Sequence, residues 1–246
     1  MSDGILVFEI SGEWGHFKRP YTTTSPLTFD LPTAPTVLGY LGAILGLDKR
    51  DYLRILNEVC RVSVALTAEP RKVNMGMNFL HTKYSFRGYH KTPHAIIGTE
   101  LIKDPSYLVF CDMNDSQLRT ELAERISQKR PYYIPCLGLA WCLAQSSWLG
   151  EFPAHIESPA GDVAILGWLP KKVIGAPILE TDKRYHMMTL PTKMAPDRQV
   201  LDFEDMVYEY SGQTIRCRLK EGTKVCRVAH GGELEGMGED VYVYLV

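Results

Sequence analysis

The chain has 246 residues, of which 45% are hydrophobic and 23% are charged, and its formal net charge is −2 at pH 7. This composition is typical of a folded globular protein and excludes a largely disordered chain, because disordered chains carry fewer apolar groups and less balanced charge. A phosphate-bearing ligand would therefore need a locally basic surface, since the chain as a whole does not attract anions.

The first predicted elements are a strand, a long loop and a helix. Ile5 to Ile10 is a short, β-branched apolar run that predicts a buried strand, and Trp14 to Phe29 has the prolines and threonines of a loop. A helix is predicted to begin near Pro35 and to end at Gly46. Glycines at positions 39 and 42 cost helix stability, and we attribute them to close packing on a sheet.

The next elements alternate between helix and strand. Asp48 is predicted to cap a second short helix, and Arg61 to Leu66 alternates polar and apolar residues as a half-buried strand does. Tyr107 to Cys111 predicts another strand, followed by a helix capped by Asn114 or Asp115. A further apolar stretch covers residues 137–149.

This order predicts an α+β fold, with a ferredoxin-like (RRM-like) βαββαβ domain in residues 1–150. An insertion of about residues 71–104, which we call the thumb, would project between its second and third strands. Residues 151–246 are predicted to form a β-rich C-terminal part. Its strands are predicted at residues 163–169, 184–190, 200–210, 214–219, 224–228 and 241–246.

Common catalytic and metal-binding motifs are missing from the sequence. There is no phosphate-binding glycine loop, no H-E-x-x-H and no G-x-S-x-G motif. The six cysteines form no C-x-x-C pair, so we interpret them as reduced and mostly buried thiols, and we expect no metal and no cofactor. Neither a signal peptide nor a membrane span is evident, and we therefore expect a cytoplasmic protein.

The strongest anomaly in composition is the stretch from Pro70 to Thr99, which contains no Asp or Glu. Cations and aromatic residues alternate in it, a mixture typical of RNA binding, because cations neutralise phosphates and aromatic rings stack on bases. A solvated hairpin whose charge has no function is the alternative. The candidate RNA-binding residues of this stretch are Arg71, Lys72, His81, Lys83, Tyr84, Arg87 and Lys91.

The loop after the first strand and two methionines of the thumb are further candidates for a contact surface. His16, Lys18 and Arg19 follow the first strand, at an edge where a ferredoxin-like sheet commonly meets its ligand, and we add them to the candidate RNA-binding residues. Met75 and Met77 suit either an adaptable contact surface or the core.

The N-terminal half resembles the CRISPR-associated Cas-five family. The resemblance depends on the opening strand, the H-F-x-x-P loop from His16 to Pro20 and the glycine-spaced helix that follows. Later features agree with it, namely the basic thumb, the D-P-S-Y segment at Asp104 to Tyr107 and the glycine-bearing loop at Pro135 to Gly138. Together they span roughly Ile5 to Gly150.

The resemblance implies a ferredoxin-like member of the RAMP superfamily and an antiviral function. Such a protein holds the 5′ handle of the guide RNA (crRNA) at one end of the Cascade complex without cutting it. Its other partners would be the backbone and large subunits, with target DNA contacted indirectly and no membrane. The chain is most similar to the type I-B group, in which another subunit processes the RNA.

One branch of that family is a metal-independent endoribonuclease that processes precursor crRNA. It uses a tyrosine in the first helix together with a lysine and a histidine. Tyr40 and the pair His90 and Lys91 are loose positional counterparts in this chain. This nuclease is our alternative hypothesis.

Overall fold

The structure is a computed structural model, and it describes residues 4–22, 24–80, 94–231 and 240–246. Four antiparallel strands form the centre of the molecule, in the order β7-β1-β6-β3. The predicted strands near residues 5, 61 and 107 are all confirmed. The four strands are β1 (Gly4–Gly12), β3 (Cys60–Leu66), β6 (Ser106–Met113) and β7 (Ala144–Glu157).

Three helices connect these strands: α1 (Ala34–Leu45), α2 (Tyr52–Val59) and α3 (Ser116–Ser127). Two predicted helix ends are confirmed. Gly46 ends α1 in the left-handed region at φ 75°, and the Asp115 side chain accepts a hydrogen bond from the Leu118 backbone N–H at the start of α3. The helix α2 begins later than predicted, with Asp51 at its cap position, but the Asp51 side chain makes no cap hydrogen bond. Asp48 does act on the turn before it, because its Oδ1 accepts from the Arg50 N–H and its carbonyl accepts from the Tyr52 N–H.

The glycines of α1 allow α2 to approach. A Cβ added at Gly42 would lie 2.9 Å from the Cβ of Tyr52, and Tyr52 is also the nearest neighbour of Gly39. The close packing predicted for these glycines is therefore present, but it is against α2 and not against the sheet. Among the described segments, no helix has the length and apolar character needed to cross a bilayer.

One face of the central sheet is covered by the helices and by a long hairpin. Leu6, Phe8 and Ile10 of β1 point to this face and share a buried cluster with α1 and α3. The hairpin consists of β11 (Tyr185–Met194) and β12 (Val200–Glu209). Its strands run beside the helices, and the Asn57 side chain of α2 donates a hydrogen bond to the Met194 carbonyl of β11.

The opposite face is covered by strands from the C-terminal part. Ile5 and Val7 of β1 and Leu108 and Phe110 of β6 pack there against residues of β8, β14 and β15. The strand β3 was predicted to be half-buried, but both of its faces are covered, and residues 62–66 are all buried. The middle of the central sheet is therefore closed to ligands on both faces.

All the strands predicted after residue 150 are present. The long strand β7 crosses residue 150 without a break and pairs first with β1 and then with β14, so the sheet continues in the order β10-β13-β8-β15-β14-β7. The pairs are antiparallel except for β15 with β8. The additional strands are β8 (Asp162–Leu166), β9 (Leu169–Pro170), β10 (Ile174–Pro177), β13 (Ile215–Leu219), β14 (Val225–Ala229) and β15 (Asp240–Val243).

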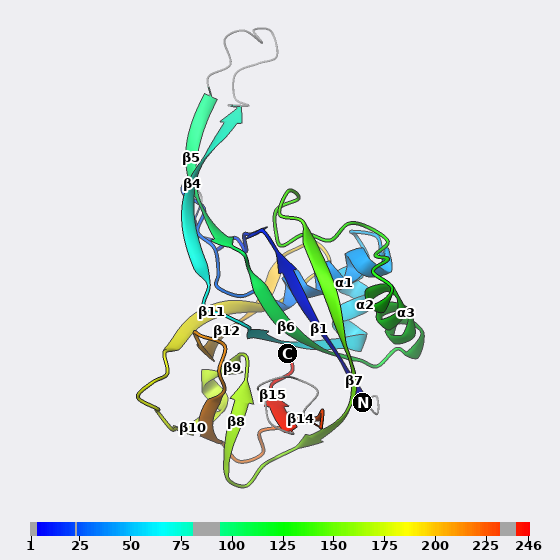
Figure 1. Cartoon of the computed structure of the whole chain (residues 1–246), viewed down its shortest axis with the longest axis vertical. Coiled ribbons are helices and arrows are strands. Elements are labelled where there is room, and N and C mark those ends of the chain that lie inside the picture. Colours follow the sequence, from blue (N-terminus) through cyan, green and yellow to red (C-terminus); the bar gives the residue numbers. More distant parts are fainter. Residues whose placement is uncertain (1–3, 23, 81–93, 232–239) are drawn as a thin grey trace.

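The thumb is a two-stranded ribbon that projects from this body (Figure 1). Its strands are β4 (Arg71–Leu80) and β5 (His94–Lys103), which pair along their whole length from Arg71 with Lys103 to Leu80 with His94. A short strand, β2 (Trp14–Gly15), pairs with the base of β5. The loop that follows β1 therefore lies at the base of the thumb.

Candidate nucleic-acid interface

The structure brings together two groups of predicted cations at the base of the thumb. Arg19 comes from the loop after β1, and Lys72 comes from the start of β4. Both donate to the same backbone carbonyl, that of Thr28, at 3.0 Å from Arg19 Nε and 3.4 Å from Lys72 Nζ. These two residues are far apart in the sequence, and the pairing of β2 with β5 brings their segments together.

The charge of Lys72 is compensated by the protein itself. Its Nζ lies 2.5 Å from Asp30 Oδ1 and 3.6 Å from Glu100 Oε2. Asp30 is buried and also accepts a hydrogen bond of 2.5 Å from the Tyr208 hydroxyl. Burial, and then this hydrogen bond, raise the pKa of Tyr208 far above its usual value, so Tyr208 stays a donor. Lys72 therefore connects three segments of the fold before it meets any ligand.

Arg71 is also paired with a carboxylate, but at the surface. Its guanidinium contacts Asp104, with side chains 62% and 48% exposed respectively. An exposed pair of this kind contributes little to stability, and its partners can exchange for a phosphate at small cost. Lys103, which the sequence argument did not consider, is exposed and lies opposite Arg71 in the ribbon.

The other predicted loop residues differ in exposure. His16, predicted as an RNA-binding residue, is only 3% exposed, and its Nδ1 lies 2.7 Å from the Glu100 carbonyl oxygen, so its ring is engaged inside the protein. Arg19 is half-buried, with its guanidinium 5.7 Å from the centre of the Phe29 ring. Lys18 is the exposed residue of the three.

The outer part of the thumb has one apolar face. Opposite residues of an antiparallel pair share a face, and Val73, Met75 and Phe79 of β4 stand on the same face as Ile97 of β5. Met75 is 37% exposed and Phe79 is 44% exposed. Met75 therefore belongs to a surface and not to the core, as one of the two alternatives for it predicted.

Five of the predicted RNA-binding residues cannot be placed. His81, Lys83, Tyr84, Arg87 and Lys91 lie outside the described residues, as do His90 and its neighbours in the nuclease hypothesis. The two strands that flank them are described, and these strands extend away from the body (Figure 1).

A stack of side chains beside Asp30 was not predicted. The His186 ring stacks on the Tyr210 ring, with ring centres 4.0 Å apart and planes inclined at 26°, and the Arg184 guanidinium lies 5.4 Å from the centre of the same tyrosine ring. Arg184 also makes two hydrogen bonds to Glu69, which lower the pKa of that carboxyl. These residues come from β11 and the residue before it, from the residue after β12 and from the segment before β4, so no local spacing in the sequence indicates them.

The position of Tyr40 does not support the nuclease hypothesis. Its side chain is 4% exposed, and its hydroxyl is hydrogen-bonded to Ser146 Oγ at 2.8 Å. Burial raises the pKa of Tyr40 to about 12. A buried hydroxyl with this pKa is poorly placed to reach an RNA phosphate or to exchange a proton with it at neutral pH.

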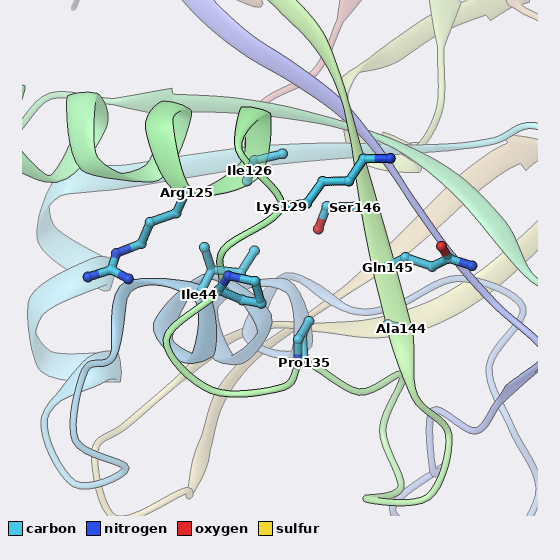
Figure 2. Close-up of a pocket in the computed structure, with 9 residues that line it drawn as sticks. Ile44, Arg125, Ile126, Lys129, Pro135, Ala144, Gln145 and Ser146 are labelled. Carbon is cyan, nitrogen blue, oxygen red and sulfur yellow. The ribbon is translucent and has the colours of Figure 1, made fainter.

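A small pocket of about 240 Å³ lies next to Ser146, between the ends of α1 and α3 and the start of β7. Figure 2 shows Ile44 and Ile126 on one side of it and Ser146 on the other, with the Arg125 side chain extending away from them.

Among the residues that the structure describes, no group of three His, Cys, Asp or Glu side chains could hold a metal ion. All six cysteines are free, and five of them are buried, as predicted.

Sequence comparison finds no matching protein family, and it finds no match among curated proteins. Structure comparison does find similar folds. A CRISPR protein from Archaeoglobus fulgidus is 12% identical, with a TM-score of 0.52 over 97% of this chain and 98% of that one. Two other similar structures have lower TM-scores. A chain of a CRISPR RNA-guided surveillance complex has a TM-score of 0.47 and is 12% identical, over 86% of this chain and 91% of that one. A chain of a type III-B Cmr-beta structure has a TM-score of 0.43 and is 11% identical, over 86% of each chain. At these identities, the first comparison shows a shared fold.

Proposed function

We propose that this chain is a non-catalytic, RNA-binding subunit of a type I CRISPR Cascade complex, which holds the 5′ handle of the guide RNA in antiviral defence. The observation that carries the proposal is the projecting thumb, whose central segment is rich in cations and free of acids, on a fold shared along its whole length with a CRISPR protein. The strand order β7-β1-β6-β3, with α1 and α3 as connections, supports the ferredoxin-like classification of residues 1–150. We propose that residues 151–246 form a second, β-rich domain.

The burial and ion pairs of the described residues separate those that position the loop from those that would contact RNA. Lys72 is held by two carboxylates, and His16 is buried, so we assign to both the positioning of the loop against the thumb. Exposed Lys18 and Arg71 would contact phosphates at the base. The remaining phosphate and base contacts are assigned to His81, Lys83, Tyr84, Arg87 and Lys91.

The partners follow from the same proposal. The exposed apolar face of the thumb, with Met75 and Phe79, would pack on RNA bases or on the backbone subunit, because flexible thioethers and aromatic rings adapt to either. The large subunit would be the second protein neighbour, target DNA would be contacted only through the complex, and the complex would act in the cytoplasm.

The test is a salt series of RNA binding by the purified chain. Replacing Lys83, Arg87 and Lys91 by alanine should weaken binding of a handle RNA and reduce the slope of log K against log salt by about 0.7 for each phosphate that is no longer neutralised. Lys49→Ala, in the loop between α1 and α2, is a control with one exposed cation removed. An unchanged slope in the triple variant would contradict the proposal. Shortened RNA after incubation with chelator would contradict its non-catalytic part.

A further inference from the structure

A second basic surface lies in the C-terminal part of the chain. Two adjoining hollows, of about 870 Å³ and 730 Å³, share Lys172 and Lys220 in their walls and so form one groove. Strand β10, which contributes Ile174 and Pro177 to the wall, lies at the end of the molecule opposite the thumb (Figure 1). The groove is therefore separate from the interface at the thumb.

The fold brings its cations together from separate places in the sequence. Lys171 and Lys172 form a short turn of 3-10 helix after β9. Lys220 and Lys224 flank the turn between β13 and β14, which is closed by a hydrogen bond from Thr223 N–H to the Lys220 carbonyl. The Lys220 N–H donates to the Val173 carbonyl at 2.9 Å, which fixes one group beside the other.

Most of these cations are not compensated by carboxylates of the described residues. Lys172 is paired with Glu204, and Arg61 of β3, at the far side of the groove, is paired with buried Asp112. Within the described segments, Lys171, Lys220 and Lys224 have no carboxylate within 4.0 Å. Glu221 and Asp205 are the other acids of the walls, and Asp205 accepts a hydrogen bond from Thr189.

The groove also contains apolar and aromatic side chains. Phe203 and Met187 line it and are 37% and 55% exposed, and Tyr244 lines its other half. Several lysines beside accessible rings are typical of a surface that follows a phosphate backbone, because the cations neutralise phosphates while the rings stack on bases or sugars. An acidic peptide would satisfy the lysines but would not explain the rings.

We propose that this groove binds the phosphodiester backbone of a nucleic acid at a second site, independent of the RNA contact at the thumb. Two sources carry this chemistry, a single-stranded RNA and a DNA duplex. The inference does not rest on the proposed handle-binding function, because its residues belong to a different face. Its failure would leave the thumb proposal intact.

The experiment compares two double charge reversals in the whole chain. Lys220→Glu with Lys224→Glu reverses two of the three uncompensated lysines of the groove, and Lys49→Glu with Arg50→Glu makes the same change in charge in the exposed loop between α1 and α2. Both pairs are exposed, so both variants should fold, and circular dichroism and the melting temperature verify this. The probes are a single-stranded polyuridine RNA of about 12 nucleotides and a DNA duplex of about 20 base pairs.

Binding is measured by fluorescence anisotropy between about 50 and 200 mM salt. The groove variant should bind at least one probe about tenfold more weakly than the control variant, with a salt slope lower by about 0.7 (RNA) or 0.9 (duplex) for each phosphate that is no longer neutralised. Weakening of RNA alone or of DNA alone identifies the source. Equal affinities and slopes for the two variants with both probes would overturn the proposal. Repeating the comparison with alanine at Lys83, Arg87 and Lys91 separates it from the thumb site, because the weakening caused by the groove variant should persist.

Discussion

Lys72 offers the most direct test of how the base of the thumb is built. Replacing it by methionine keeps the length of the side chain but removes the ammonium that faces Asp30 at 2.5 Å and Glu100 at 3.6 Å. Removing one partner of a buried ion pair costs about 3–5 kcal/mol, because the other charge is left without compensation. The Lys72 side chain is 24% exposed and that of Asp30 only 4%, so we reduce the expected cost to about 2–3 kcal/mol for partial screening by solvent.

The assay is urea denaturation, with Arg71→Met as the matched control. The control removes the adjacent cation of β4, whose pair with Asp104 is exposed, and it should cost less than about 1 kcal/mol. In an Asp30→Asn background, Lys72→Met should lose most of its effect, since the two substitutions act on one interaction. Equal costs for the two methionine variants, or simple additivity with Asp30→Asn, would refute the assignment of Lys72 to positioning.

Three further predictions concern other parts of the fold. Burial raises the pKa of Glu209, but hydrogen bonds from backbone N–H groups, that of Gln213 first, lower it more, so the pKa lies below the usual 4.5. The ionised carboxylate therefore stabilises the fold above pH 4.5, and this contribution is lost as the pH falls below that value. Glu209→Gln should lower the melting temperature by its full amount above pH 4.5 and by less at lower pH. Tyr40→Phe should cost about 1 kcal/mol in urea and leave RNA length unchanged in a cleavage assay, whereas a loss of cleavage would revive the nuclease hypothesis. Gly138→Ala should destabilise by more than about 3 kcal/mol, since φ is 93° and the new Cβ would lie 1.8 Å from a backbone oxygen; Gly98→Ala, with open space around it, is the control and should cost less than about 1 kcal/mol.

The helices and strands could be predicted because local chemistry determines them. Gly46 stops α1 through a left-handed conformation that other residues adopt at a cost, and Asp115 caps α3 with its own side chain. The start of α2 was predicted too early because Asp48 caps a turn that precedes the helix, and the sequence does not distinguish that turn from the helix itself. The sequence did not indicate which strands close the second face of the central sheet, because they come from distant segments later in the chain.

The candidate site was harder to predict, because ion pairing is a property of space and not of sequence. The stretch around Arg71 and Lys72 contains no acid, yet Asp30 and Asp104 reach these cations from outside it. The same limit concealed the groove, since Lys171 and Lys220 lie in segments of ordinary composition. A run without acids indicates where cations are concentrated, but the surrounding fold decides which of them remain available to a ligand.

The coverage of the central sheet has a consequence for biosynthesis. While the chain emerges from the ribosome, Ile5 and Val7 of β1 and Phe110 of β6 lack their partners in β14 and β15 until residues 225–243 have been made. Contacts this distant in sequence form slowly, and an uncovered apolar face aggregates in the meantime. Expression of residues 1–150 alone would make that interval permanent, and a chaperone that shields the nascent first half should raise the yield of the whole chain.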